Sequence, residues 1–319
     1  MSGNHELTVH RFEHEAMATT FEVLIAGKDA SYACQVSMEV FREIDRLEKI
    51  LSRFEPGSDI VAINRLKPGE SVPVGLETVE CLELAWRVWK ETGGAFDICY
   101  AARSTKEAEG EGAEGVDGGS AGAPRGLERL AILQGDAEHP GFSVGILPVP
   151  GEESFGGVKI DLGGIGKGYA LDKAAELLAD WDVDCALLNS GTSTVLAVGP
   201  AQEGGWPLGI GGPWGSVAGM RRVMLRNRAL SGSGTEVKGQ HIVDPRTGRP
   251  ATAHLAAWVA APSAALSDAL STALFVMSPE EAGAYCESHP EISAFLVSKG
   301  APGEPDVVKI HGTWQPVGT

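Results

Sequence analysis

The sequence predicts an α+β fold, and three observations carry that prediction. The chain has 319 residues, 43% of them hydrophobic, which is enough to bury a sizeable core. Short runs with strand-like alternation occur together with longer runs of helical spacing. The two kinds are mixed without the strict strand–helix–strand alternation that a doubly wound parallel sheet requires.

The N-terminal part begins with a strand and continues with two helices. Residues Thr20–Ala26 alternate apolar and polar side chains, which predicts a half-buried strand. Apolar residues at helical spacing predict a long helix from Ser31 to about Phe54, which Pro56-Gly57 would end. A second amphipathic helix is predicted over Leu76–Thr92, and Gly93-Gly94 is a typical helix stop.

The second half of the chain continues the same mixture. Apolar runs between turn residues predict strands, and longer amphipathic runs predict helices. In chain order we expect a strand ending at Asp161, a helix over Ile165–Asp180, a strand over residues 185–199, a strand at Trp206–Ile210, a strand over residues 256–262, helices over Ala264–Val276 and Glu280–His289, and a last strand at Ser293–Ser298.

Residues 105–125 differ from the rest of the chain because they are mostly Gly, Ala and Glu. Such a segment cannot bury enough apolar surface to offset the entropy lost on ordering. We therefore expect a disordered acidic insertion at 105–125 within a single domain over residues 1–319, and we assign the insertion no function.

Charge and hydropathy exclude several kinds of partner. Acidic residues outnumber basic ones 43 to 26, a formal charge of −17, so nucleic acid and anionic bilayers would be repelled. No apolar run approaches the length of a membrane span, and the first twenty residues contain no apolar stretch of the signal-peptide kind. We expect a cytoplasmic protein without stable membrane insertion.

The five cysteines are odd in number and widely spaced, and none forms a C-x-x-C pair. This spacing suggests neither a disulfide framework nor a zinc site. We expect each cysteine to be a small core residue.

The stretch KIDLGGIGKGYALDKAAELL, residues 159–178, combines a glycine-rich turn with a lysine and a helix start. It is not a P-loop, because Asp161 stands where the first glycine belongs and Gly168 where a hydroxyl belongs. Tyr169 likewise replaces the third glycine of the dinucleotide fingerprint. Lys167 at a helix N-terminus opposes the macrodipole, which becomes favourable if an anion lies between them; an exposed lysine in a tight turn is the alternative.

Two further segments carry polar side chains in apolar surroundings. Asp268 and Thr272 lie four residues apart on one face of a predicted helix, with oxygens of the kind that Mg²⁺ takes. The alternative is that Asp268 lies near the N-cap and Thr272 bonds back to a carbonyl. His241 precedes a predicted β-turn at 244–248 and could act as a general base near neutral pH, although a lone histidine is more often structural.

Taken in order, these segments resemble the ApbE family of FAD:protein FMN transferases. The resemblance spans essentially the whole chain, from EAMATTFEV through LSRFEPGSDIVAIN, TGGAFD, KIDLGGIGKGYALD, LLNSGTSTVLAVG and HIVDPRTGRP to SDALSTALFVM. It implies an ApbE-like fold, related to the T-fold, with mixed and mostly antiparallel sheets flanked by helices. It also implies that FAD is the substrate and Mg²⁺ the metal.

By matching position, the resemblance assigns roles to individual residues. The metal ligands would be the Gly164 carbonyl, Asp268 and Thr272, and the residue implicated in transfer would be His241. The residues implied to contact FAD are Met17, Phe54, Ala95, Phe96, Asp97, Asp161, Lys167, Ile242 and Val243. The family usually shows Met-Gly-Thr where this chain has Met-Ala-Thr, and the turn after Asp97 departs from the family pattern.

The resemblance implies that the FMN moiety of FAD moves to a threonine hydroxyl of an acceptor protein bearing a Ser/Thr-rich motif, with release of AMP. A metal that clamps the pyrophosphate would be the main electrostatic contribution to such a phosphoryl transfer. Two alternatives remain open. The same site could hydrolyse FAD to FMN and AMP, or the chain could bind and deliver flavin with little chemistry.

Overall fold

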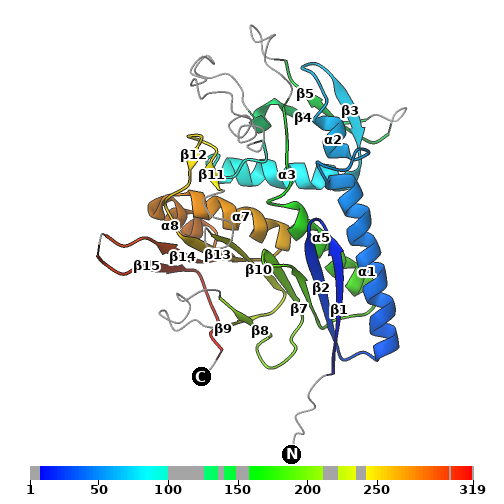
Figure 1. Ribbon diagram of the computed structural model, residues 1–319, viewed down its shortest axis with the longest axis vertical. Helices are drawn as coiled ribbons and strands as arrows, with labels where there is room; N and C mark the ends of the chain where they lie inside the picture. The colour runs from blue at the N-terminus through cyan, green and yellow to red at the C-terminus, as the bar shows by residue number, and fades with distance from the viewer. Residues whose placement is uncertain are drawn as a thin grey trace, which may run out of the picture. The chain divides into compact units, whose positions relative to one another are not determined.

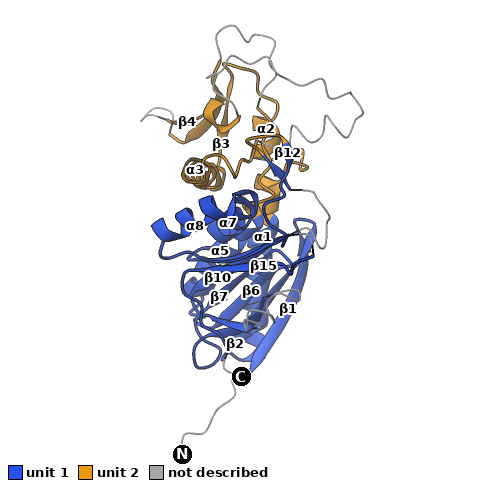
Figure 2. Ribbon diagram, turned by 90° about the vertical axis from the view of Figure 1, so that its left-hand side faces the viewer, with its two compact units in different colours: residues 1–45, 167–244, 249–319 blue, residues 46–166, 245–248 orange. Residues whose placement is uncertain are grey.

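A computed structural model describes residues 8–99, 126–135, 140–148, 158–210, 222–234, 242–301 and 303–317. The insertion predicted at 105–125 and His241 lie outside these residues. The chain forms two compact units, shown in different colours in Figure 2. Unit 1 contains Met1–Asp45, Lys167–Asp244 and Arg249–Thr319, and unit 2 contains Arg46–Gly166 and Pro245–Gly248. The expectation of a single domain stays a prediction.

Unit 1 is built on an eight-stranded sheet in which every neighbouring pair of strands is antiparallel (Figure 1). The strand order is β1-β2-β6-β7-β10-β13-β14-β15. The strands are β1 (Val9–Ala16), β2 (Thr19–Ala26), β6 (Ala186–Ser190), β7 (Thr194–Val198), β10 (Arg228–Gly234), β13 (Ala256–Ala261), β14 (Ser293–Ser298) and β15 (Val307–His311).

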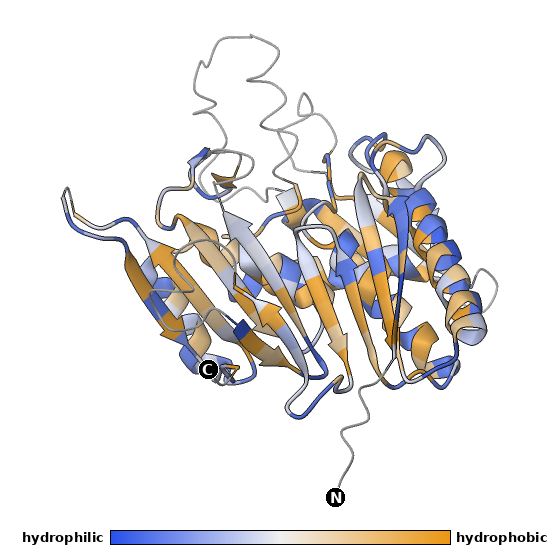
Figure 3. Cartoon of the chain, turned by 60° about the horizontal axis from the view of Figure 1, so that its bottom comes forward, coloured by the Kyte–Doolittle hydropathy of each residue, from blue (hydrophilic) through white to orange (hydrophobic). Residues whose placement is uncertain are grey.

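Helices cover one face of this sheet. Helix α7 (Ala264–Val276) packs on β7, β10 and β13, and α5 (Gly166–Asp180) and α8 (Pro279–Ser288) lie with it in Figure 1. The hairpin β8 (Trp206–Gly209) and β9 (Arg222–Leu225) contributes to an apolar cluster with residues of the sheet such as Leu230 and Phe295. Figure 3 shows the apolar residues that gather on the strands. The sheet is thus buried on both faces in its central part.

Unit 2 contains a three-stranded antiparallel sheet of order β3-β5-β4. Helix α1 (Ala30–Leu51) contributes residues to both units, and the two-residue strands β11 and β12 of unit 1 flank the turn 245–248. The remaining elements are α2 (Asp59–Ile63), β3 (Ser71–Val74), α3 (Leu76–Glu91), a short 3₁₀ helix at Gly126–Arg129, β4 (Leu130–Gln134), β5 (Phe142–Ile146), β11 (Val243–Asp244) and β12 (Arg249–Pro250).

Helices α5 and α7 approach each other closely at their N-terminal ends. A Cβ atom on Gly168 would lie 2.3 Å from the carbonyl oxygen of Ala264 and 2.7 Å from the Cα of Ala265. Only glycine permits two backbones to come this near. This contact explains why residue 168 is glycine where a P-loop would carry a hydroxyl.

The structure confirms the α+β fold with mostly antiparallel sheets flanked by helices. The predicted helices at residues 31–54, 76–92, 165–180, 264–276 and 280–289 correspond to α1, α3, α5, α7 and α8. Helix α1 ends at Leu51, three residues earlier than predicted, and the Ser52 hydroxyl accepts the N–H of Phe54 just beyond that end.

The single strand predicted over residues 185–199 is wrong. The segment forms a hairpin of β6 and β7. Gly191 adopts a φ of 62°, a left-handed conformation that lets the chain reverse between two apolar runs. The sequence predicts one strand because the apolar runs before and after Gly191 have the same strand-like alternation.

The strand predicted to end at Asp161 is also wrong, since residues 158–162 lie in none of the sheets. Their backbone N–H and C=O groups instead form hydrogen bonds with groups that belong to no strand. The Asn64 side chain donates to the Ile160 carbonyl at 3.0 Å and accepts the Ile160 N–H at 2.7 Å. The Asp161 N–H donates to the Ile98 carbonyl at 2.9 Å. A side-chain amide thus replaces a neighbouring strand.

Two smaller expectations also fail. The strand at Ser293–Ser298 forms as β14, but it is not the last, because β15 pairs with it at the sheet edge. Four cysteines are buried as expected, whereas Cys34 is exposed on α1.

Among the described residues, no helix is both long enough and apolar enough to cross a bilayer.

We predict that Gly168→Ala destabilises the protein by about 2 kcal/mol or more, because its methyl group would collide with backbone atoms that cannot move aside. Gly57→Ala is the matched control, since no atom lies within 4 Å of a Cβ at that position. Urea unfolding followed by far-UV circular dichroism measures both variants. Equal unfolding free energies for the two variants would contradict the close approach of α5 and α7.

Candidate functional site

The residues with predicted roles divide between the two units. Unit 1 holds Met17, Lys167, Ile242, Val243, Asp268 and Thr272, while unit 2 holds Phe54, Ala95, Phe96, Asp97, Asp161 and Gly164.

Asp268 is the most unusual residue of unit 1, because its carboxylate is buried in the middle of an apolar helix. Its side chain is 6% exposed. The Ser193 hydroxyl donates to Oδ1 at 3.2 Å, and the amine of Lys167 lies 3.9 Å from Oδ2. Oδ2 itself has no hydrogen-bond donor among the described residues. A buried carboxylate oxygen left in this state is costly unless a cation approaches it.

The alternative that Asp268 lies in the first turn of α7, near the N-cap, is wrong. The N-cap of α7 is Ser263, whose hydroxyl accepts the N–H of Leu266 at 3.2 Å, and Asp268 lies a full turn further along. The alternative for Lys167 fails as well. Its side chain is 22% exposed and faces Asp268, so it is not an exposed lysine in a turn.

Asp172 of α5 fixes the N-terminus of α7. Its Oδ1 accepts the N–H of Ala264 at 2.7 Å, and its Oδ2 accepts the N–H of Ala265 at 2.9 Å. With the Ser263 hydroxyl on Leu266, the first N–H groups of α7 are satisfied by side chains. Burial raises the pKa of Asp172 to about 6, and the two backbone N–H groups offset part of that rise.

Hydroxyl groups line the α7 face next to Asp268. Ser233 of β10 lies 2.9 Å from the hydroxyl of Ser271 and 3.4 Å from that of Thr272. In the described parts of the chain, no three His, Cys, Asp or Glu side chains gather as a metal cluster. The oxygens of Asp268 and Thr272 on one helix face suit a hard cation such as Mg²⁺, which takes few protein carboxylates.

The turns at the same end of the sheet approach each other closely. Met17 and Ala18 link β1 to β2 with φ angles of 50° and 57°, a left-handed pair that normally favours Asn-Gly. A Cβ on Gly191 would lie 2.1 Å from the Thr19 hydroxyl, and the Gly191 N–H donates to the Thr20 carbonyl at 2.9 Å. Strained turns of this kind concentrate at functional sites, so Met17 stays a candidate.

Ile242 and Val243 are half-buried at the start of the β11–β12 hairpin. The Ile242 carbonyl accepts the N–H of Ala251 at 2.9 Å, and Val243 pairs with Pro250. His241 precedes them and lies outside the described residues, so its predicted role has no structural test.

In unit 2, Arg53 joins two of the predicted residues. Its Nε lies 3.0 Å from Oδ2 of Asp161, and its guanidinium stacks 4.4 Å from the centre of the Phe54 ring. The Phe54 side chain is 76% exposed, which is unusual for a large aromatic residue. Asp161 also accepts the N–H of Gly163 through Oδ1 at 2.8 Å, so it organises the glycine-rich turn.

The turn after α3 is mostly internal. Ala95 and Phe96 are buried, and Asp97 accepts the Cys99 N–H at 2.8 Å. Contact of Ala95 or Phe96 with a ligand would therefore be limited to backbone atoms or to the edge of a side chain. Gly164 is half-buried in the turn that precedes α5.

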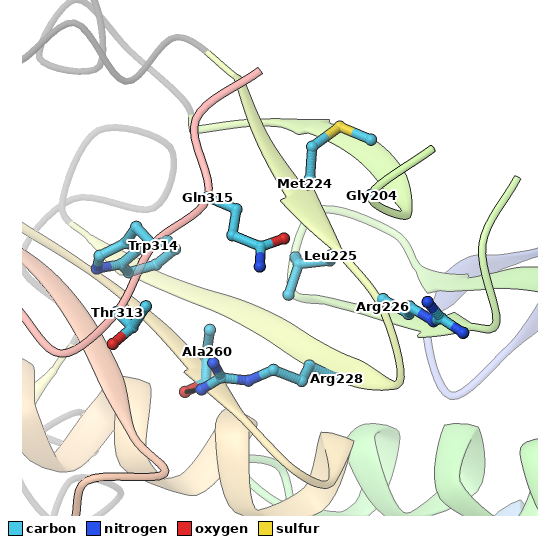
Figure 4. Close-up of a pocket in the computed structure, with 9 residues that line it drawn as sticks. All are labelled: Gly204, Met224, Leu225, Arg226, Arg228, Ala260, Thr313, Trp314 and Gln315. Atoms are coloured by element: carbon cyan, nitrogen blue, oxygen red, sulfur yellow. Dashed lines mark hydrogen bonds between the residues drawn. The ribbon is translucent and has the colours of Figure 1, made fainter. Parts of the chain in front are cut away.

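A separate cavity of about 330 Å³ lies in unit 1 between β9, the start of β10 and the C-terminal segment (Figure 4). Its walls include Leu225, Trp314 and Gln315, and the Arg228 guanidinium donates to the carbonyl oxygens of Ala260 at 2.9 Å and Glu291 at 2.6 Å. None of the residues with a predicted role lines it. We assign this cavity no part in the candidate site.

Sequence reasoning missed Asp172, Ser193, Ser233 and Arg53. The sequence does contain a signal for Asp172. It is an acidic residue inside a predicted helix, and it follows Lys167 in the same glycine-rich stretch. The spacing of 75 residues between Ser193 and Asp268 hid their contact.

The fold is that of solved flavin transferases. The flavin transferase ApbE from Vibrio cholerae matches with a TM-score of 0.74 at 20% identity, covering 96% of this chain and 97% of that one. The apo form of the flavinyl transferase ApbE from Pseudomonas stutzeri gives 0.73 at 24% identity, with 95% and 94% covered.

Residues 17–296 match the model of the ApbE family, so the chain belongs to the ApbE family. Curated relatives include the FAD:protein FMN transferase of Escherichia coli strain K12, which is 25% identical over 297 residues, 87% of this chain and 81% of the relative. That of Treponema pallidum strain Nichols is 29% identical over 278 residues, 81% and 76% respectively. The resemblance inferred from the motifs is thereby confirmed.

We predict a specific pH dependence for the Asp172 contact. The pKa is raised from 3.8 to about 6 on folding, so the native protein retains a proton that the unfolded chain loses over this range. Relative to Asp172→Asn, the unfolding free energy should therefore fall by about 3 kcal/mol as the pH rises from about 4 to about 7.

Urea unfolding of both proteins across this range measures the difference, and the Asn variant serves as the control that does not titrate. If the unfolding free energy of the unaltered protein, relative to that of Asp172→Asn, instead rises with pH, the prediction is wrong. The helix N-terminus would then stabilise the Asp172 carboxylate more than burial destabilises it.

Proposed function

We propose that this chain is an Mg²⁺-dependent transferase that moves FMN from FAD to a threonine hydroxyl of an acceptor protein. The threonine oxygen forms a new bond to the phosphorus of the FMN phosphate. The bond between that phosphorus and the bridging oxygen of the pyrophosphate breaks, and AMP leaves with that oxygen. The hydroxyl proton passes to a base on the protein or to solvent.

The observation that carries this proposal is the buried Oδ2 of Asp268, which lacks a hydrogen-bond donor among the described residues in a chain of the ApbE family. The oxygens of Asp268 and Thr272 would hold the cation, with the Gly164 carbonyl as a third proposed ligand. When bound, Mg²⁺ supplies charge neutralisation at the phosphate oxygens. The carboxylate is already desolvated, so its attraction for a cation is weakly screened.

Lys167 would bind the pyrophosphate of FAD. It lies in the first turn of α5, where the positive end of the helix dipole favours an anion. The N-terminus of α7 is excluded as a phosphate site because Asp172 occupies it. The protein carries a net charge of −17, so a local cation and Lys167 together are needed to attract an anionic substrate.

The flavin side of the site is proposed from the family positions. The residues concerned are Met17, Phe54, Ala95, Phe96, Asp97, Asp161, Ile242 and Val243. Among them, the exposed Phe54 ring offers a flat apolar face that could pack on an isoalloxazine ring. His241 is the proposed base for the acceptor hydroxyl, since imidazole titrates near neutral pH.

The proposed acceptor is a protein segment rich in serine and threonine around the modified residue. Replacing that hydroxyl by water would turn the same reaction into hydrolysis of FAD to FMN and AMP. Both reactions would use the same cation ligands, so a test must separate the products.

We predict that Asp268→Asn lowers AMP release from FAD by about 100-fold or more, because loss of the carboxylate removes several kcal/mol of charge stabilisation. The assay incubates the protein with FAD, Mg²⁺ and an acceptor carrying a Ser/Thr-rich flavinylation motif. Chromatography measures AMP, and in-gel fluorescence measures flavin bound covalently to the acceptor.

In the same assay, His241→Ala should keep the affinity for FAD and lose transfer of FMN to the acceptor.

Asp180→Asn is the matched control, since Asp180 is exposed near the end of α5 and should leave both products unchanged. AMP without a fluorescent acceptor would identify a hydrolase. Tight FAD binding without AMP would identify a flavin-binding protein. Normal turnover by Asp268→Asn would overturn the proposed role of this carboxylate.

A further inference from the structure

The two carboxylate oxygens of Asp268 have different surroundings. Oδ1 accepts a hydrogen bond from the Ser193 hydroxyl at 3.2 Å. Oδ2 receives no hydrogen bond from a described residue and lies 3.9 Å from the Lys167 amine. Because the side chain is 6% exposed, water does not equalise the two oxygens. The carboxylate therefore has one oxygen bonded to the protein and one available to a cation.

Ser193 is itself held in place by backbone contacts. It lies in the turn between β6 and β7, and its N–H donates to the Ser190 carbonyl at 3.3 Å. Its carbonyl accepts the N–H of Gly232 from β10 at 3.0 Å. The preceding Gly191 has a φ of 62° and lies against Thr19 so closely that no side chain would fit. The hydroxyl is thus presented to α7 from a constrained turn rather than from a mobile loop.

We infer that Ser193 is a positioning residue for the cation site, a role that rests on the proposed function of Asp268. By donating to Oδ1, Ser193 stops the carboxylate from rotating and keeps Oδ2 directed toward the cation. A carboxylate without that bond would share its two oxygens between Lys167 and the cation. Partners of this kind, which orient a ligand without touching the metal, commonly change metal affinity by about 10- to 100-fold.

Mn²⁺ tests this inference, because electron paramagnetic resonance counts free Mn²⁺ directly and needs no turnover. With the full chain and no FAD, Ser193→Ala should raise the Kd for Mn²⁺ by about 10-fold. Ser193→Thr keeps the hydroxyl and should restore the affinity of the unaltered protein. Thr192→Ala removes an exposed hydroxyl from the same turn and should change nothing.

Two further readouts separate positioning from a structural role. In the AMP assay, Ser193→Ala should raise the Mg²⁺ concentration needed for half-maximal rate while kcat at saturating Mg²⁺ stays near that of the unaltered protein. Urea unfolding should show that Ser193→Ala remains folded.

Asp268→Asn is the reference variant in the same titration. If it loses Mn²⁺ while Ser193→Ala binds as tightly as the unaltered protein, the role of Ser193 is overturned and the cation site stands. If Asp268→Asn binds Mn²⁺ normally, the cation site and the role of Ser193 both fail.

Discussion

The carboxylate of Asp172 holds the first two N–H groups of α7, and the candidate site of unit 1 depends on that contact. It joins α5 to α7 at the point where Gly168 lets their backbones meet. Lys167 then lies beside Gly168 on one helix and Asp268 one turn into the other. Burial makes the ionised Asp172 costly, by about 3 kcal/mol at neutral pH on the basis of its raised pKa. In return, the contact fixes the helices that carry the two charged side chains, Lys167 and Asp268.

Charge is distributed so that the acidic protein can accept an anionic ligand locally. Asp172 occupies the positive end of α7, so in the proposed function the positive end of α5 and Lys167 would bind the phosphate. Asp268 would hold the cation, because its carboxylate is buried and one oxygen lacks a hydrogen bond from the described residues. The Ser193 hydroxyl bonds this carboxylate and the Ser233 hydroxyl of β10 lies next to Thr272, and neither adds charge. The proposed site would therefore combine a hard cation with an anionic substrate.

Local patterns predicted the α+β class, the five longest helices and the placement of Asp268 and Thr272 on one helical face. They failed where the partner of a group is distant in sequence. The Asp172 contact joins residues 92 apart, and the Ser193 contact joins residues 75 apart. The extended residues before Asp161 read as a strand although the Asn64 side chain replaces the strand partner. The hairpin at residues 191–193 was hidden because its turn contains a single glycine between two apolar runs.

In the proposed function, Oδ2 of Asp268 and the hydroxyl of Thr272 bind the cation that neutralises the pyrophosphate of FAD. Anomalous diffraction from crystals grown with Mn²⁺ and FAD tests it most directly, because Mn²⁺ is located independently of any assay. We expect an anomalous peak in direct coordination with both oxygens and with a phosphate oxygen, while Ser193 stays bonded to Oδ1. An FAD-bound protein whose Mn²⁺ lies on other residues, with Oδ2 still facing Lys167, would contradict it.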